Sequence, residues 1–205
     1  MVKLFLGVGI NDAEYAVKVY ETIGYTNGKR NRKLVWMCPF YTRWTNMLQR
    51  CYSDSYQKKT PTYRGCSVCE DWKYFSKFKA WMITQDWEGN ELDKDILVKG
   101  NKVYSPETCV FITRMVNSFV VERDASRGKY PIGVYWSKHH EKYLARCQNP
   151  FTNKYEYLGA FNDPQEAHKA WLIKKYELAN LLAGTQKDER VAKALINKYE
   201  SYTLT

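Results

Sequence analysis

Two of the six cysteines, Cys66 and Cys69, are separated by two residues, which is the spacing of half a zinc site. Cys51 and Cys109 could complete a set of four thiolates around a structural zinc ion. Against this, only one closely spaced pair is present, and a lone cysteine is most often a small buried hydrophobic residue. The sequence therefore favours reduced, buried thiols and leaves structural zinc as an alternative.

The charge balance favours an anionic partner. The 205 residues include 32 Lys and Arg against 22 Asp and Glu, which gives a formal net charge of +10. Such an excess suits binding to the phosphates of a nucleic acid, although a soluble basic protein can have the same composition. The aromatic content of 16 % excludes a disordered tail. No segment approaches the ~20 apolar residues of a membrane span, and we expect no membrane partner and a cytoplasmic location.

Hydrophobic spacing and turn residues predict an α+β fold. Segments 27–33, 54–66 and 123–130 are polar and rich in turn residues, and the basic segment 27–33 is either a loop or an arm that contacts a nucleic-acid backbone. Asp12 and Asp163 are expected to cap helices. Helices are predicted at 12–24, 39–52, 71–86, 114–122, 164–182 and 188–199, and strands at 92–96, 109–112, 132–137, 142–149 and 155–161.

The strand–loop–strand–helix unit at 92–122 resembles the core of HNH endonucleases of the phage and homing types. The resemblance extends upstream through aromatic and cysteine positions and covers about residues 39–120. It implies a ββα-metal fold and hydrolysis of phosphodiester bonds in double-stranded DNA with one divalent ion, Mg²⁺ or Mn²⁺. The matching segments are Leu92-Asp93-Lys94-Asp95-Ile96, Tyr104-Ser105-Pro106-Glu107-Thr108-Cys109-Val110-Phe111, and Asn117.

The resemblance assigns roles position by position. Asp93 corresponds to the metal ligand at the end of the strand, and Asn117 to the metal ligand on the helix. Lys94 stands where the family has the His that acts as general base, and Thr108 stands where the family has the Asn that braces the loop. Asp95 is a secondary carboxylate, because period two would place it on the face of Asp93.

The usual base is missing, because the three histidines, His139, His140 and His168, all lie downstream of this unit. Some HNH restriction enzymes carry a basic residue at that position and a Tyr in the loop, and Tyr104 has that placement. We expect Tyr104, with a pKa lowered by Lys94 and the metal, to activate water, or Lys94 to polarise the phosphate while Tyr104 orients water. The alternative is a non-cleaving DNA-binding regulator with a degenerate HNH core.

Residues 131–182 resemble the apetala/ethylene-response-factor (ERF) DNA-binding domain, which several phage and homing HNH nucleases carry after the core. The resemblance implies a three-stranded sheet in the major groove and one helix packed behind the sheet. The expected DNA-facing residues are Trp136, Lys138, Arg146 and Gln148, with Tyr155 or Lys154 as further candidates. The expected core between sheet and helix is Leu144, Leu158, Phe161, Ala167 and Ala170.

These features predict four segments: 1–38 without an assigned role, an HNH-like domain at 39–126, an ERF-like domain at 131–182 and a C-terminal helix within 183–205. The expected partner is double-stranded DNA, the expected location is the host cytoplasm if a phage encodes the chain, and the oligomeric state is open. A third interpretation, an RNA-binding or protein-interaction module, rests on charge and aromatic content alone.

Overall fold

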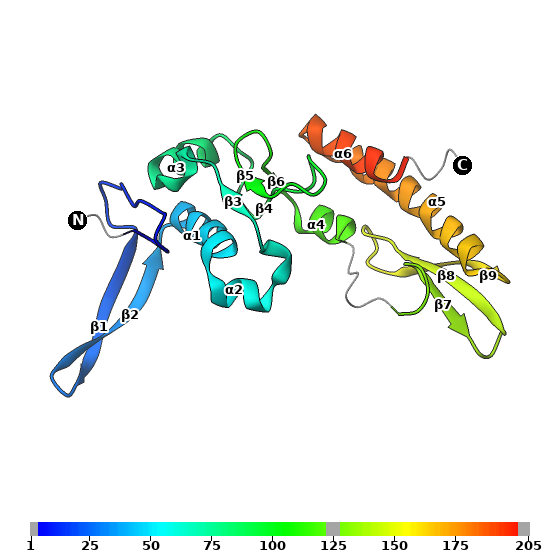
Figure 1. The fold of residues 1–205 in the computed structure, drawn as a ribbon, viewed down its shortest axis with the longest axis horizontal. Helices are drawn as coiled ribbons and strands as arrows, with labels where there is room; N and C mark the ends of the chain where they lie inside the picture. Colours follow the sequence, from blue (N-terminus) through cyan, green and yellow to red (C-terminus); the bar gives the residue numbers. More distant parts are fainter. Residues whose placement is uncertain (1–3, 122–127, 201–205) are drawn as a thin grey trace. The chain divides into compact units, whose positions relative to one another are not determined.

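The computed structural model describes residues 4–121 and 128–200, which form an α+β fold, as predicted. The chain divides into two compact units, Met1–Phe111 and Ile112–Thr205 (Figure 1). The polar segment 123–130, which we interpret from the sequence as a linker, lies mostly outside the described residues, as does the last residue of the helix predicted at 114–122. Among the residues described, no helix combines the length and apolarity needed to span a membrane.

An antiparallel two-stranded ribbon opens the regular structure of the first unit. Strand β1 (Lys18–Thr26) pairs with β2 (Lys29–Met37), and the two are joined by Asn27 and Gly28. Both joining residues have positive φ, 49° and 72°, as a two-residue type I′ hairpin turn requires. Figure 1 shows the ribbon extending from the start of α1 with no other element beside it.

The ribbon overturns the predicted helix at 12–24 and the predicted loop at 27–33. The apolar positions of the segment 12–24 fit a helical period, but most residues of 18–26 are β-branched or aromatic, which suits a strand. The Asn-Gly pair decides between the two periods, because its positive φ angles set the twist that joins two adjacent strands.

Asp12 does cap a helix, but a distant one. Its carboxylate accepts the backbone N–H of Ser76 at 2.8 Å and also the Ser76 hydroxyl. Ser76 lies in the first turn of α3 (Phe75–Ile83), where amide groups have no partner within the helix. The segment before the ribbon is thereby tied to α3.

The helices of the first unit surround an aromatic core. Helices α1 (Pro39–Tyr52) and α3 pack together, and the indole N–H of Trp44 donates to the carbonyl of Trp72 at 2.7 Å. The prediction for 39–52 is confirmed, since Pro39 begins α1. The predicted helix at 71–86 is shorter, because a 3₁₀ turn (Asp71–Lys73) precedes α3, and the turn-rich segment 54–66 contains α2 (Asp54–Lys59) and a 3₁₀ turn (Pro61–Tyr63).

Four short strands complete this part of the chain. Strand β3 (Ser67–Val68) runs parallel to β5 (Val103–Tyr104), and β4 (Glu91–Asp93) pairs with β6 (Val110–Ile112). The strands predicted at 92–96 and 109–112 are therefore present, but the first one ends at Asp93.

The second unit combines three helices with a three-stranded antiparallel sheet. The sheet has the order β7 (Val134–Ser137), β8 (Lys142–Gln148), β9 (Tyr155–Phe161), and the helices are α4 (Arg114–Val120), α5 (Pro164–Ala183) and α6 (Glu189–Glu200). These elements match their predicted positions within a few residues. Asp163 caps α5 as predicted, because its carboxylate accepts the N–H of Gln165 at 3.0 Å.

Helix α5 packs closely on one face of this sheet. Ala145 and Cys147 of β8 are buried on that face, and Ala167 of α5 is buried on the helix side of the same contact. A Cβ atom on Gly133 would lie 2.0 Å from the Trp171 ring, and the φ of Gly133 is +84°, so only glycine fits there. Helix α4 packs in the same unit, since the Lys175 ammonium of α5 donates to the Phe119 carbonyl at 2.7 Å.

Candidate functional site

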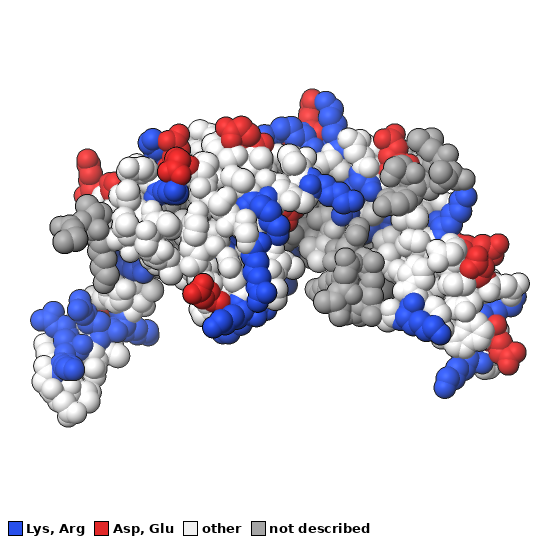
Figure 2. Space-filling model, viewed as in Figure 1, with Lys and Arg blue, Asp and Glu red and all other residues white. Residues whose placement is uncertain are grey.

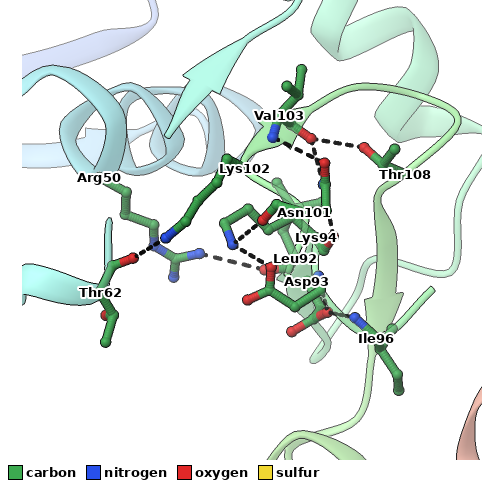
Figure 3. A network of polar contacts seen from close by, with 11 residues as sticks. Arg50, Thr62, Leu92, Asp93, Lys94, Ile96, Asn101, Lys102, Val103 and Thr108 are labelled. Atoms are coloured by element: carbon green, nitrogen blue, oxygen red, sulfur yellow. Dashed lines mark hydrogen bonds and ion pairs between the residues drawn. The ribbon is translucent and has the colours of Figure 1, made fainter. Parts of the chain in front are cut away.

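Asp93 ends β4 with its carboxylate fixed by the backbone. Its Oδ1 accepts the N–H groups of Asp95 at 2.8 Å and Ile96 at 2.7 Å, which turns the chain out of the strand (Figure 3). Burial raises the pKa of the Asp93 carboxyl, and the two amide hydrogen bonds oppose that rise. The other carboxylate oxygen, Oδ2, has no hydrogen-bond partner among the described residues. Asp93 therefore offers one positioned oxygen that is open to a ligand.

Lys94 is enclosed by the loop that follows β4. Its ammonium forms an ion pair with Asp95 and donates to the Asn101 carbonyl at 2.9 Å. The side-chain amide of Asn101 donates back to the Lys94 carbonyl at 2.8 Å and to the Val103 carbonyl at 2.7 Å (Figure 3). Lys94 is only 5 % exposed. The expectation that it polarises a phosphate is therefore corrected, because its charge is used to close the loop.

Thr108 braces the far end of this loop, as the resemblance implies. Its hydroxyl donates to the Val103 carbonyl at 2.8 Å and lies 3.1 Å from the Ser105 hydroxyl. Asn101 and Thr108 thus converge on one carbonyl group (Figure 3). Sequence reasoning missed Asn101, although its place after Gly100 in a polar loop marks it as a turn residue.

Tyr104 is buried, with 1 % of its surface exposed, and this corrects its assignment as the base. Burial raises the pKa of the phenol well above its usual range, and the neighbouring Arg50 guanidinium offsets only part of that rise. The Lys94 ammonium lies 5.9 Å from the ring centroid, a cation–π distance. Lys94 therefore faces the ring of Tyr104, and the protein groups around the phenol raise its pKa above the usual value.

Arg50 links helix α1 to β4, a role that sequence reasoning did not assign to it although Arg50 lies within the segment that resembles HNH proteins. Its guanidinium donates to the Leu92 carbonyl at 3.4 Å and interacts electrostatically with the Tyr104 hydroxyl. It also lies 5.5 Å from the Tyr63 ring centroid. These contacts raise the Arg50 pKa against the effect of burial. Arg50 holds the start of the loop from residues far away in the sequence.

Asn117 lies on α4, in the second unit. It is half-buried, and its backbone N–H donates to the Thr113 carbonyl at 3.0 Å in the first turn of the helix. The Thr113 hydroxyl caps the same helix by accepting the Val116 N–H at 3.2 Å. The structure thus describes the two predicted metal ligands in separate units, Asp93 in the first and Asn117 in the second.

The cysteines of the predicted zinc alternative are mostly buried thiols. Burial raises the pKa of Cys51 to about 12 and that of Cys109 to about 12, so both are protonated at neutral pH. Cys66 is buried and Cys69 is partly exposed. Within 4–121 and 128–200, no group of three or more His, Cys, Asp or Glu side chains is arranged to hold a metal ion.

The second unit presents a sheet face away from α5 that carries both Arg146 and Gln148. The Arg146 guanidinium lies 4.9 Å from the Tyr135 ring centroid and 4.6 Å from the Tyr155 ring centroid. Cross-strand register places Arg146 opposite Tyr157 and Gln148 opposite Tyr155. We call these five residues the open sheet face. The tyrosines Tyr135 and Tyr157 were missed by sequence reasoning, although period two from Arg146 and its partner strand points to them.

Trp136 and Lys138 do not share the open sheet face. Trp136 pairs with Tyr143, and their ring centroids lie 4.8 Å apart, so Trp136 is one residue out of step with Tyr135. Lys138 lies in the exposed turn after β7. Leu144, predicted for the core between sheet and helix, is buried but occupies the register row of Tyr135, on the face turned away from α5.

No known protein family, characterised protein or solved structure matches the chain.

Proposed function

We propose that the chain binds duplex DNA and hydrolyses its phosphodiester bonds in a divalent-metal-dependent reaction of the HNH endonuclease type. The observation that carries this proposal is the carboxylate of Asp93. Two backbone amides, at 2.8 and 2.7 Å, hold Oδ1 at the end of β4, and Oδ2 is left for a ligand. A fixed carboxylate oxygen at a strand end suits a hard divalent cation.

In the first unit, Asp93 would hold the ion through its carboxylate. When bound, a Mg²⁺ or Mn²⁺ ion stabilises charge on the scissile phosphate and lowers the pKa of bound water. The chain's own contribution is to keep Asp93 in place. Lys94, Asn101 and Thr108 lock the loop that follows it, so that the carboxylate does not have to be ordered when substrate arrives.

DNA binding is supported by the open sheet face. Arg146 is the cation of that face, and stacking against Tyr135 and Tyr155 holds its guanidinium in place. An arginine fixed in this way can donate two hydrogen bonds to guanine or to phosphate. The Gln148 amide donates to Asn153 at 2.8 Å, which leaves its carbonyl oxygen as an acceptor for a base edge or a water.

A second candidate function is a DNA-binding regulator that does not cut. It is favoured by burial, because Tyr104, assigned to activate or orient water, is 1 % exposed and Lys94, assigned to polarise the phosphate, is 5 % exposed. A core that has lost its base would keep these packing contacts and the fold. The two candidates agree on DNA binding and differ only at the scissile phosphate.

Plasmid cleavage separates the two candidates. Full-length protein is incubated with supercoiled plasmid and Mg²⁺ or Mn²⁺, with a chelator control, beside Asp93→Asn and Glu88→Gln. Asp93→Asn keeps an oxygen that can accept both amide hydrogen bonds, whereas Glu88→Gln removes an exposed charge shortly before β4.

Under the nuclease proposal, wild type and Glu88→Gln give nicked or linear plasmid, and Asp93→Asn gives none while keeping the wild-type melting temperature. Cleavage by Asp93→Asn at the wild-type rate would show that this site is wrong. If no protein cuts with either metal but wild type shifts duplex DNA in a gel, the regulator is the better description.

A further inference from the structure

The ribbon of β1 and β2 is a second surface with the composition of a nucleic-acid contact. None of its residues is buried. It holds five basic residues and one acidic residue, and its large exposed side chains include Tyr20, Tyr25 and Trp36. Figure 2 shows Lys and Arg side chains gathered along the ribbon. The basic residues are Lys18, Lys29, Arg30, Arg32 and Lys33, and the acidic residue is Glu21.

Cross-strand register sorts these side chains onto two different faces. Tyr25 lies opposite Arg30, Thr22 opposite Arg32, and Tyr20 opposite Leu34. Arg30, Arg32 and Leu34 alternate along β2 and therefore share one side of the ribbon. We call this side the Arg face: it holds Tyr20, Thr22, Tyr25, Arg30, Arg32 and Leu34.

The other side, the Lys face, has a different character. It holds Lys29 and Lys33, and Lys33 lies directly opposite Glu21, the one carboxylate of the ribbon. The Asn31 amide donates to the Thr26 hydroxyl at 2.8 Å, which confirms that these two residues share this side. The Arg face has no acidic residue, so its positive charge is not offset locally.

The low intrinsic stability of a hairpin and its exposed side chains favour binding of the ribbon to a partner. A two-stranded hairpin is marginally stable in water on its own, and this one exposes 48 % of Tyr20, 67 % of Tyr25 and 43 % of Leu34. Arginine forms paired hydrogen bonds with phosphate, and tyrosine adds rigid contact area and a hydroxyl donor. The major groove of B-form DNA is wide enough to admit a two-stranded ribbon.

We propose that the Arg face of the ribbon binds duplex DNA, with Arg30 and Arg32 on phosphates or base edges and Tyr20 and Tyr25 beside them. This inference rests on the DNA-binding part of the proposed function and adds a second contact surface to it. It does not depend on cleavage, because the ribbon contains none of the residues at β4.

A charge-matched pair of variants tests the proposal. Arg30→Gln/Arg32→Gln alters the Arg face and Lys29→Gln/Lys33→Gln alters the Lys face, and each removes two positive charges. Binding of the full chain to a fluorescently labelled DNA duplex of mixed sequence is followed by anisotropy, with a chelator present to prevent cleavage. Arg146→Ala, on the open sheet face, is measured in parallel.

The Arg-face variant is expected to bind about tenfold more weakly at about 0.1 M salt. Its slope of log K against log salt should shrink by about 1.8, as expected for two lost phosphate contacts. The Lys-face variant should bind within about twofold of wild type. Because both variants lose the same net charge, this difference would show that the loss of affinity depends on which face is altered. Unchanged circular dichroism and melting curves for both variants would show that the ribbon still folds.

Five results would overturn the inference. Equal losses of DNA affinity in both variants would mean that only the net charge of the ribbon matters. Normal binding by the Arg-face variant together with weak binding by Arg146→Ala would mean that only the second unit binds DNA. A tighter complex with duplex RNA, or a dimer of free wild type that the Arg-face variant dissociates in sedimentation, would assign the face to another partner. Failure of wild type to bind duplex DNA at all would remove both this inference and the proposed function.

Discussion

The two larger antiparallel β structures of this chain differ in what covers them. The sheet of β7, β8 and β9 packs one face on α5, and that face holds Ala145 at 0 % exposure and Cys147 at 1 %. The ribbon of β1 and β2 packs neither face, and none of its residues is buried. Both nevertheless expose arginine beside tyrosine. Arginine and tyrosine are therefore exposed together both on a sheet that has a hydrophobic core and on a ribbon that has none.

Because of this difference, we expect different residues to determine the folding stability of the chain and its binding to DNA. The sheet derives its stability from apolar burial against α5, so its open face is free to vary without unfolding the unit. The ribbon depends on its Asn-Gly turn and on cross-strand pairs, each of which contributes only a fraction of a kcal/mol to ~1 kcal/mol. Substitutions behind the sheet should change folding, whereas substitutions on either exposed surface should mainly change binding.

The largest effect is expected from Trp171→Ala, behind the sheet. Trp171 is 6 % exposed and packs against Gly133, so its removal leaves a cavity and should cost ~3–5 kcal/mol of unfolding free energy. The matched control is Trp36→Ala on the ribbon, where the indole is 46 % exposed and the cost should be below ~1 kcal/mol. Urea denaturation of each variant measures the difference. An equal loss of unfolding free energy in both variants would mean that Trp36 makes packing contacts as important for stability as those of Trp171.

Local sequence signals predicted those elements whose ends carry specific residues. Helix α5 follows from Asp163 as cap and Pro164 in the first turn, and α1 follows from Pro39. The ribbon was missed because apolar positions before Gly24 fit both a helix and a strand, and the choice depends on pairing with a segment that the turn brings back. Asp12 shows the same limit, since the helix that it caps lies 64 residues further along the chain.

For the candidate site, the place of each residue on a strand or loop was easier to predict than the burial of its side chain. The sequence placed Asp93 at a strand end and Thr108 as the brace of the loop, and both have those positions. The burial of Tyr104 and Lys94 depends on Arg50 and on closure of the loop by Asn101, which are tertiary contacts. On the sheet, the error between Trp136 and Tyr135 is a register shift of one residue, which moves a side chain to the opposite face.

A smaller effect, on binding alone, is expected from Arg146→Ala. Loss of the guanidinium should weaken binding of duplex DNA by ~1–3 kcal/mol, because it removes the cation held between Tyr135 and Tyr155. Trp136→Ala, one residue out of register, should leave binding nearly unchanged. Anisotropy titration at two salt concentrations gives both values. A larger loss for Trp136→Ala would mean that DNA approaches the edge of β7 and not the open sheet face.

The smallest effect is a pH dependence of the stability of the sheet, which arises from Glu156. Glu156 of β9 accepts a hydrogen bond from Asn149 at 2.6 Å and pairs with Lys174 of α5 at 3.0 Å, and these two contacts lower the pKa of its carboxyl. A lowered folded-state pKa adds stability above the unfolded-state pKa of about 4.3, and this stability is lost as the pH falls through the folded-state pKa. Glu156→Gln should therefore melt below wild type at neutral pH, and the gap should narrow as the pH drops below about 4. Glu21→Gln, on the exposed ribbon, is the matched control and should melt close to wild type at neutral pH. A constant gap for Glu156→Gln would show that the carboxylate contributes through packing on α5 and not through its charge.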